Sequence, residues 1–324
     1  MAQAKRSQQP TGRHSGQGPV EAPTDLPASG WTGSVKRTFK QAKDDRISLT
    51  AAGVAFYWFL SVFPLLIAAV GILALLHVGH GFVTGVSKGV RQTLPSGAAN
   101  VLTQAVSSAS GRTAGGVVAA VVAIAIALWS ASSGMASSEE ALDVAYDVPE
   151  SRKFIKKRAV AILLTFIALA LGGIATALLV FGKPLGVAIN NAVSLGSMFP
   201  VLWTIVRWAL TVLAVMTLYS AFYYLGPNRK PPTWKWVSPG GVVAAIIWLA
   251  ASVGFSFYVS NFGGSYGKTY GSLAGVVILM LWLYLSALAL LFGAELNGEL
   301  EGEKALRERG TADPNEVRKL RQVS

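Results

Sequence analysis

The chain has 324 residues, of which 52% are hydrophobic and only 14% are charged. Soluble domains usually carry about a quarter charged residues, so this composition favours a membrane protein. The chain has no cysteine, which excludes disulfides, thiolate metal sites and cysteine nucleophiles. A formal net charge of +12 would indicate nucleic-acid binding in a soluble protein, but here each charge must first be assigned to a side of the membrane.

The two ends of the chain are polar. Residues 1–30 are rich in Gly, Pro, Ser and Gln and contain no apolar run, so we expect a disordered tail rather than a signal peptide. We expect a transmembrane domain over residues 31–297. Residues 298–324 then form a polar cytoplasmic tail.

Six segments are apolar over the roughly twenty residues that a membrane-spanning helix requires. In chain order they cover about 49–76, 114–135, 159–181, 201–225, 239–261 and 272–294. Pro64 should kink the first helix, and Ser61 is a candidate partner for the carbonyl that Pro64 frees. Pro239 is expected to open the fifth helix, where a missing amide does no harm. The predicted fold is therefore an all-α, polytopic membrane protein with about six transmembrane helices.

The connections predicted to lie outside the cell have features of their own. Residues 82–106 and Val187–Met198 show weak helical periodicity, which favours short amphipathic or re-entrant helices, with irregular loops as the alternative. Between the fifth and sixth spans, glycines recur every four residues from Gly263 to Gly275. We expect the first of them to form a flexible turn, whereas Gly271 and Gly275 are candidates for close helix packing.

Serines crowd one half of the second span, beginning at Ser130. Such serines either bond back to helix carbonyls or join neighbouring helices. A polar pathway through the membrane is the alternative interpretation.

Lysine and arginine predict the orientation of the chain. Clusters precede the first span, separate the second from the third and the fourth from the fifth, and recur in the C-terminal tail. The positive-inside rule places these clusters and both termini in the cytoplasm. Most of the net charge is then a topology signal, and contact with membrane lipids can add to it. No nucleic-acid partner is needed to explain it.

Carboxylates are confined to three regions: residues 1–46, 139–150 and 295 onward. All three are predicted to be cytoplasmic, and the acids of 139–147 are interpreted as a solvated helix face. The spans and outer loops hold only cations, namely Lys88, Arg91, Arg112, Lys183, Arg207 and Lys268. This asymmetry predicts a site for an anion or a phospholipid head group, with Arg207 deepest and Lys183 and Lys268 as further contacts. The alternative is that Arg207 only extends to lipid phosphates.

Motifs for catalysis are missing from the sequence. It has no Gly-rich phosphate loop, no Ser-His-Asp set, no zinc motif and no paired carboxylates within a span. We therefore expect no enzymatic activity, no cofactor and no metal.

Three stretches resemble the YihY/BrkB-like family of bacterial inner-membrane proteins, once labelled ribonuclease BN. They are residues 51–66, 223–241 and 270–297, and the most specific is the helix ending Gly293-Ala294-Glu295-Leu296-Asn297. The resemblance implies a six-helix protein of the bacterial plasma membrane without a settled activity or agreed catalytic residues. We expect a protein that binds or transports an anionic lipid or amphiphile. A non-transporting envelope scaffold is the alternative, and ribonuclease activity is not expected.

Overall fold

The structure is a computed structural model that describes residues 20–75, 116–149, 152–194, 196–229, 233–270 and 273–309. Every regular element in these ranges is helical, which confirms the all-α, polytopic fold class. In chain order the elements are the 3-10 helix η1 (Pro23–Asp25), α1 (Ala28–Asp44), α2 (Ile47–Leu75), α5 (Gly116–Ala145), α6 (Phe154–Ile167), the π-helix η3 (Ala168–Gly172), α7 (Gly173–Val193), α8 (Phe199–Leu225), α9 (Trp234–Tyr270) and α10 (Ala274–Arg309).

Each predicted span lies within one continuous helical segment of the structure, apart from one or two end residues, and most of these segments extend well beyond the span. They correspond to α2, to α5, to the continuous run α6–η3–α7, and to α8, α9 and α10. Within the described residues, four helical segments are long and apolar enough to cross a membrane: Phe154–Leu179, Phe199–Leu225, Trp234–Asn261 and Ala274–Glu308. α2 contributes a shorter apolar stretch, Ile47–Val62.

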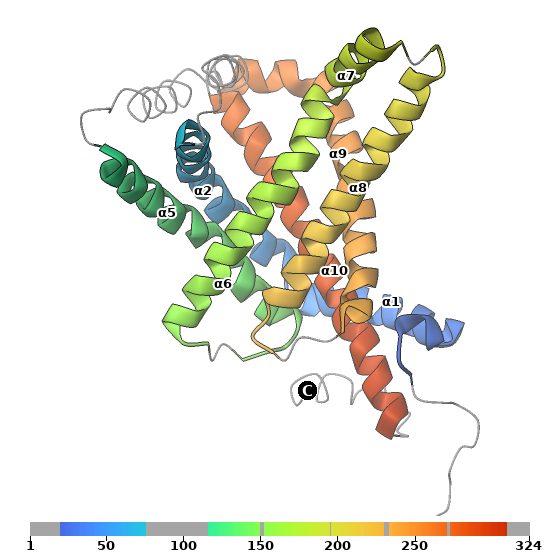
Figure 1. Ribbon diagram of the computed structural model, residues 1–324. Coiled ribbons are helices and arrows are strands. Elements are labelled where there is room, and N and C mark those ends of the chain that lie inside the picture. The colour runs from blue at the N-terminus through green and yellow to red at the C-terminus, as the bar shows by residue number, and fades with distance from the viewer. Residues whose placement is uncertain are drawn as a thin grey trace, which may run out of the picture.

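α10 is the central helix of the bundle. It packs against α9, α2, α5 and α1, while α2 packs on α5, α7 on α8, and α8 on α9 (Figure 1). The lower ends of these helices converge, and the upper ends of α5 and α7 diverge (Figure 1). The largest buried cluster lies where the helices converge and includes Tyr223, Ala244 and Leu290, each fully buried.

The crossing of α9 with α10 is very close, because both helices present glycine there. A Cβ atom on Gly240 would overlap the carbonyl oxygen of Gly293, so neither helix could approach as closely with larger residues. Asn297 is fully buried at this crossing. Its Oδ1 accepts from the Gly240 amide at 2.7 Å, and its Nδ2 donates to the Val237 carbonyl at 3.1 Å.

The expected position of Pro239 was wrong. α9 begins at Trp234, so Pro239 lies inside the helix rather than at its first residue. The carbonyl that Pro239 frees is that of Lys235. Asn297 of α10 instead bonds the Gly240 N–H and the Val237 carbonyl, on either side of the proline. Only the packing of α10 supplies this partner.

Two connections that were predicted to lie outside the cell also differ from the expectation. α9 stays helical through Tyr270, so the flexible turn expected from Gly263 onward does not form there. The separate helix expected at Val187–Met198 is instead the last part of α7, which ends at Val193 and bends near its outer end (Figure 1). Pro184 inside α7 gives a reason for the bend. Gly271 and the expected outer helices of 82–106 lie outside the described residues.

The polar ends pack against the bundle. Val20 and Leu26, within the tail expected over residues 1–30, are buried against Trp236 and Leu300. α10 passes through the expected boundary at residue 297 without a break, and Leu300 and Leu306 are buried. The division into three domains stays a prediction.

Candidate functional site

The residues predicted to bind an anion lie on the hairpin of α7 and α8. Lys183 is exposed on α7, and Arg207 is partly buried on α8. The side chain of Lys268 lies outside the described residues. Arg207 is eight residues from the start of α8, so it lies about 12 Å along the helix from its N-terminal end.

Gly182 lets the Arg207 side chain lie against α7, one residue before Lys183 in the sequence. A Cβ atom on Gly182 would overlap Cδ of Arg207, so the arginine stem lies directly against the backbone of α7. One turn away, the Trp203 indole donates to the Gly182 carbonyl at 2.6 Å. The hydrogen bond to this carbonyl and the missing Cβ atom of Gly182 together determine how closely α7 and α8 pack. The sequence predicted the two cations as site residues but not Gly182. No pattern in the sequence shows which residues of α7 face which residues of α8.

The Arg207 guanidinium has no acidic partner among the described residues. Its Nε is buried without a hydrogen bond in this part of the chain. Its neighbours on α8 are exposed and apolar, namely Ile205, Val206, Trp208 and Leu210. Arg207 is therefore a cation set into an apolar outer surface.

The residues predicted for a kink or polar packing are placed as follows. Ser61 donates to the Tyr57 carbonyl at 2.8 Å, rather than to the Leu60 carbonyl that Pro64 frees, and it packs against Gly134 of α5. Pro64 lies within α2. Ser130 is exposed on α5, and Gly275 is half-buried in the first turn of α10.

Other serines of α5 join helices. Ser138 accepts from the Trp58 indole at 2.8 Å, which connects α5 to α2. Ser132 accepts from Arg158 of α6 at 2.9 Å, and the Arg158 guanidinium lies 4.3 Å from the Trp129 ring centroid. These serines therefore pair with neighbouring helices as well as with carbonyls of their own helix.

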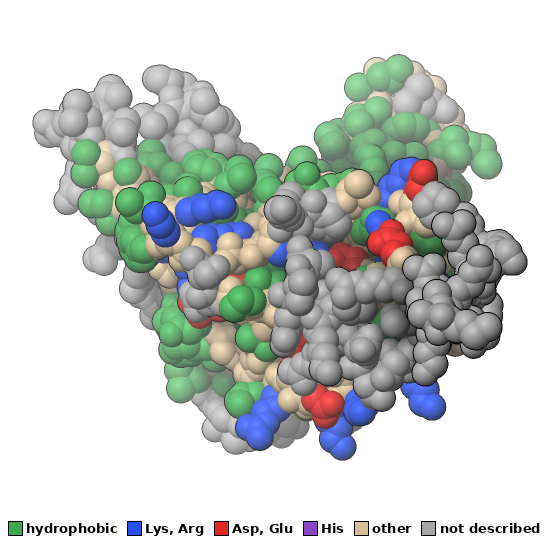
Figure 2. All heavy atoms as spheres, turned by 90° about the horizontal axis from the view of Figure 1, so that it is seen from below, with side chains coloured by type: hydrophobic (Ala, Val, Ile, Leu, Met, Phe, Trp, Pro, Cys, Tyr) green, Lys and Arg blue, Asp and Glu red, His purple; other side chains and the backbone are tan. Residues whose placement is uncertain are grey.

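The three acidic regions of the sequence meet at one end of the bundle. We call it the charged end: α1, the last turns of α5, the α5–α6 and α8–α9 connections, and α10 beyond Glu295. Figure 2 shows this face, on which acidic and basic side chains are both exposed. Arg37 of α1 binds Glu299 at 2.7 Å and Glu303 at 2.9 Å on α10. Arg229, after α8, pairs with Glu301, and its guanidinium lies 4.0 Å from the Tyr146 ring centroid.

The interpretation of the 139–147 acids as a solvated face was wrong for Glu139 and Asp143. Both are buried, because α5 continues to Ala145 and packs beneath the turn after α8. Arg152 donates to Glu139 at 2.6 Å and also to the Gly226 and Pro227 carbonyls. Asp143 Oδ1 accepts a hydrogen bond from the backbone N–H of Asn228 at 2.7 Å.

Burial and nearby charges shift the pKa values of Glu139 and Arg229 at the charged end. Burial raises the pKa of Glu139 to about 7, although Arg152 opposes the shift. At Arg229, burial alone would lower the pKa, but Glu301 and Tyr146 raise it above the ordinary value. The charged end is thus a buried ionic network that holds α5, α8 and α10 together.

Comparison with known proteins assigns the chain to a family. The model for the family described as "Virulence factor BrkB" matches residues 38–319. The chain belongs to this family. It is 36% identical over 256 residues to a Bacillus subtilis (strain 168) protein, YfkH, whose name describes it as ribonuclease-like; the match covers 79% of this chain and 90% of YfkH.

Shorter matches connect the BrkB-family chain to proteins named UPF0761 membrane proteins. The protein from Tolumonas auensis is 42% identical over 79 residues, which cover 24% of this chain and 26% of that protein. The protein from Alteromonas mediterranea is 38% identical over 106 residues, which cover 33% of this chain and 35% of that protein. No solved structure matches the chain. The family and these names agree with the apolar helices in placing the chain in a membrane.

The helix ending that carried the resemblance to the BrkB family has a structural explanation. Gly293 permits the close approach of α9, and Asn297 bonds the backbone on both sides of Pro239. Glu295, between them, is fully buried. This motif therefore fixes the α9–α10 crossing.

Proposed function

We propose that this BrkB-family protein lies in the bacterial plasma membrane, with its charged end in the cytoplasm, and binds or transports an anionic lipid or amphiphile. The observation that carries the proposal is the position of Arg207. Its stem lies against Gly182, its Nε is buried, and the neighbouring residues of α8 are exposed and apolar. A guanidinium in such a place favours a bound phosphate, whose geometry it matches.

No carboxylate among the residues that the structure describes forms an ion pair with Arg207. The sequence has no Asp or Glu between Glu150 and Glu295. The charged end begins after Leu225, which lies about 27 Å from Arg207 along α8. An anion from outside the chain is therefore the natural counter-ion of Arg207 and Lys183.

The test is lipid transfer and binding by the full chain in liposomes. Phosphatidylglycerol and phosphatidylcholine with identical acyl chains serve as anionic and zwitterionic probes. Loss of the charge-assisted contact in Arg207→Ala should lower the preference for phosphatidylglycerol by about tenfold. Arg207→Lys should retain part of it, because the charge remains without the planar fork.

Lys156→Ala is the matched control, since it removes an exposed cation near the charged end. Size-exclusion profiles of all variants show whether each is folded. Unchanged preference in Arg207→Ala, also when combined with Lys183→Ala, would show that this site does not bind the lipid.

We further infer a role without catalysis. Ribonuclease chemistry needs an accessible acid–base pair or metal-binding acids. Among the acids of residues 139–147 at the charged end, Glu139 and Asp143 are buried. A purified preparation that cleaves RNA, and loses this activity in Glu139→Gln, would contradict the inference.

One observation favours the alternative of an envelope scaffold. The α8–α9–α10 core is closely packed through Gly240, Gly241 and Gly293, with Tyr223 bonded to the Leu290 carbonyl at 2.8 Å. Such a core suits a rigid platform. A scaffold would show no lipid preference in liposomes, so the same experiment separates the two functions.

A further inference from the structure

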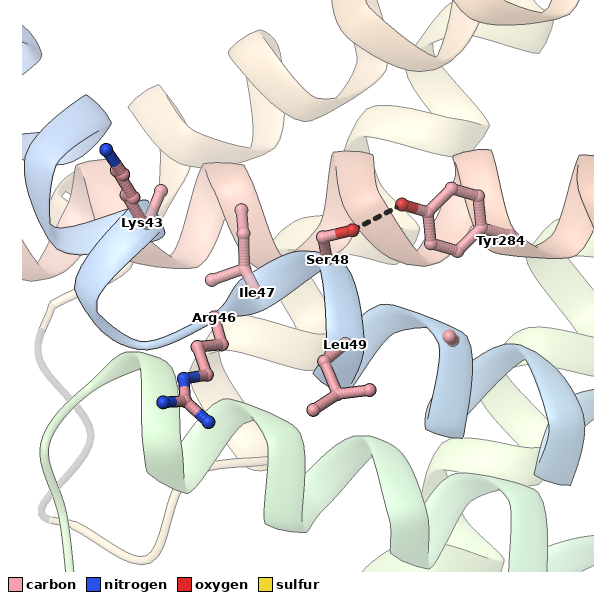
Figure 3. A pocket seen from close by; sticks show the side chains of 8 residues that line it. Lys43, Arg46, Ile47, Ser48, Leu49 and Tyr284 are labelled. Atoms are coloured by element: carbon pink, nitrogen blue, oxygen red, sulfur yellow. Dashed lines mark hydrogen bonds between the residues drawn. The ribbon is translucent and has the colours of Figure 1, made fainter.

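A pocket lies at the charged end, far from Arg207, where α1 turns into α2 and faces α10. Its volume is about 590 Å³. The residues that define its chemistry are Lys43, Arg46, Ile47, Ser48, Leu49 and Tyr284 (Figure 3). Neither the predicted anion site nor the buried ionic network includes any of them.

The sharp turn from α1 to α2 forms this pocket. Arg46 has a φ of 49°, a left-handed conformation that turns the chain between the two helices. α1 lies across the lower ends of the other helices, whereas α2 rises into the bundle (Figure 1). The ion pairs from Arg37 to Glu299 and Glu303 hold α1 against α10. The pocket is therefore part of the folded chain and needs no ligand to form.

The pocket is apolar at its base, and two cations lie at its edge. Ile47 is buried, and Leu49 is 69% exposed on the side of α2. Ser48 and Tyr284 share a hydrogen bond of 2.6 Å that joins α2 to α10. Lys43 and Arg46 extend to either side of the turn (Figure 3). This combination suits a ligand with a phosphate beside an apolar chain.

Both cations are available to a ligand. Lys43 and Arg46 are exposed, and neither makes an ion pair with any residue that the structure describes. Asp44 and Asp45 lie between them in the sequence, but neither lines the pocket. Asp45 accepts a hydrogen bond from Gln41 at 2.8 Å on α1 itself.

The orientation of α1 identifies the source of the ligand. One side of α1 packs on α10 through Gly30, Ser34, Thr38 and Ala42, spaced by four residues. Beside this stripe Val35 and Phe39 are 40% and 63% exposed, and Lys36 and Lys40 are also exposed. Exposed apolar side chains next to lysines are typical of a helix that lies in the membrane interface. The pocket at the end of α1 is then at the depth of lipid head groups.

We propose that this pocket binds an anionic phospholipid from the leaflet at the charged end. Lys43 and Arg46 flank its charged head group from the two sides of the turn, the Ser48–Tyr284 pair bonds its polar glycerol region, and an acyl chain lies along Leu49. The site does not depend on the outer site at Arg207.

The absence of cysteine allows a site-specific test. Leu49→Cys in the full chain provides a single position for a bimane label. The labelled protein is reconstituted with brominated phosphatidylglycerol or brominated phosphatidylcholine, whose bromines quench bimane at contact. We expect phosphatidylglycerol to quench at a roughly tenfold lower mole fraction than phosphatidylcholine, as two charge-assisted contacts predict.

Paired variants locate the effect. Lys43→Gln with Arg46→Gln should abolish the difference between the two lipids. Lys36→Gln with Lys40→Gln is the matched control, because it removes two exposed cations of α1 outside the pocket and should preserve the difference. Equal losses in both pairs, or no loss in the first, would overturn the proposal.

Two further measurements distinguish this pocket from the site at Arg207 and from a site for a free anion. Arg207→Ala should leave the quenching unchanged, so that failure of the outer site and failure of this one are distinguishable. Millimolar inorganic phosphate should also leave it unchanged, because the acyl chain contributes to binding. Displacement by phosphate would show a site for a free anion and contradict the lipid proposal.

Discussion

The protonation of Glu139 makes the stability of the folded chain depend on pH. Burial raises its pKa to about 7, with Asp143 adding to the shift and Arg152 and Lys157 opposing it. An unfolded glutamate loses its proton near pH 4.5, so the folded chain holds one more proton than the unfolded chain between about pH 4.5 and 7. Stability from this group is therefore greatest below that window and falls as the pH rises through it.

Glu139→Gln should remove this dependence. Its apparent melting temperature, measured in detergent from pH 5 to pH 8, should fall less steeply with pH than that of the unchanged protein. Glu140→Gln is the matched control, because Glu140 is 56% exposed and pairs with Lys157 at the surface. Identical slopes in Glu139→Gln and the unchanged protein would contradict a buried proton at Glu139.

Asn297 supports a proline from another helix. Its amide satisfies the Gly240 N–H and the Val237 carbonyl, which lie on either side of Pro239. Asn297→Leu keeps a similar volume but removes the side-chain acceptor of the buried Gly240 N–H, at a cost of about 1–3 kcal/mol. We expect a clear drop in melting temperature. Asn261→Leu, at an exposed position of α9, should have little effect.

At the scale of elements, the close α9–α10 crossing requires a residue without a Cβ atom at position 240. A Cβ atom on Gly240 would overlap the backbone of Gly293, which cannot move without separating the two helices. We expect Gly240→Ala to lower the melting temperature and the yield of folded protein, because overpacking of a core typically costs about 1–3 kcal/mol.

Gly254→Ala, on the same helix, is the matched control. No atom lies within 4 Å of the position that its Cβ would occupy, so the change only improves helix propensity, by about 1 kcal/mol. Its melting temperature should stay equal or rise. If both alanine variants behaved alike, the crossing would be less close than the structure places it.

Sequence patterns predicted the spans because each apolar run reports directly on one helix. They did not predict that Pro239 lies inside α9, because its partner Asn297 is distant in the sequence and meets it only in the packed bundle. The same limit explains α1. Its stripe of Gly30, Ser34, Thr38 and Ala42 is made of small residues, and such a stripe becomes informative only beside its partner helix.

The candidate site was predictable in its charges but not in its geometry. The confinement of acids to three regions is visible in the sequence, and the structure gathers the described ones at one end. The contact of Arg207 with Gly182 requires the register of α7 against α8, which no local pattern records. Burial of Glu139 was missed for a similar reason, since its cover comes from the turn after α8.

At the scale of the whole molecule, charge and apolar surface divide the bundle into two unequal ends. The charged end is cross-linked by ion pairs among α1, α5, α10 and the α8–α9 connection, whereas α7 and α8 carry only Lys183 and Arg207 toward the other end. An anionic amphiphile would meet cations at both ends of the bundle, at Arg207 and at Lys43 with Arg46. Both proposals therefore require that the two ends face opposite sides of the membrane.

Labelling of single cysteines tests this sidedness. Ser194→Cys places a thiol in the exposed turn between α7 and α8, and Lys153→Cys places one just before α6 at the charged end. On intact cells, a membrane-impermeant maleimide should label the first and not the second, and both should react after the membrane is opened. The positive-inside rule requires this result, since lysine and arginine gather at the charged end. The reverse pattern would place the buried ionic network outside the cell and Arg207 near the cytoplasmic leaflet. Lipid binding at Arg207 would then draw on the opposite leaflet from the one proposed.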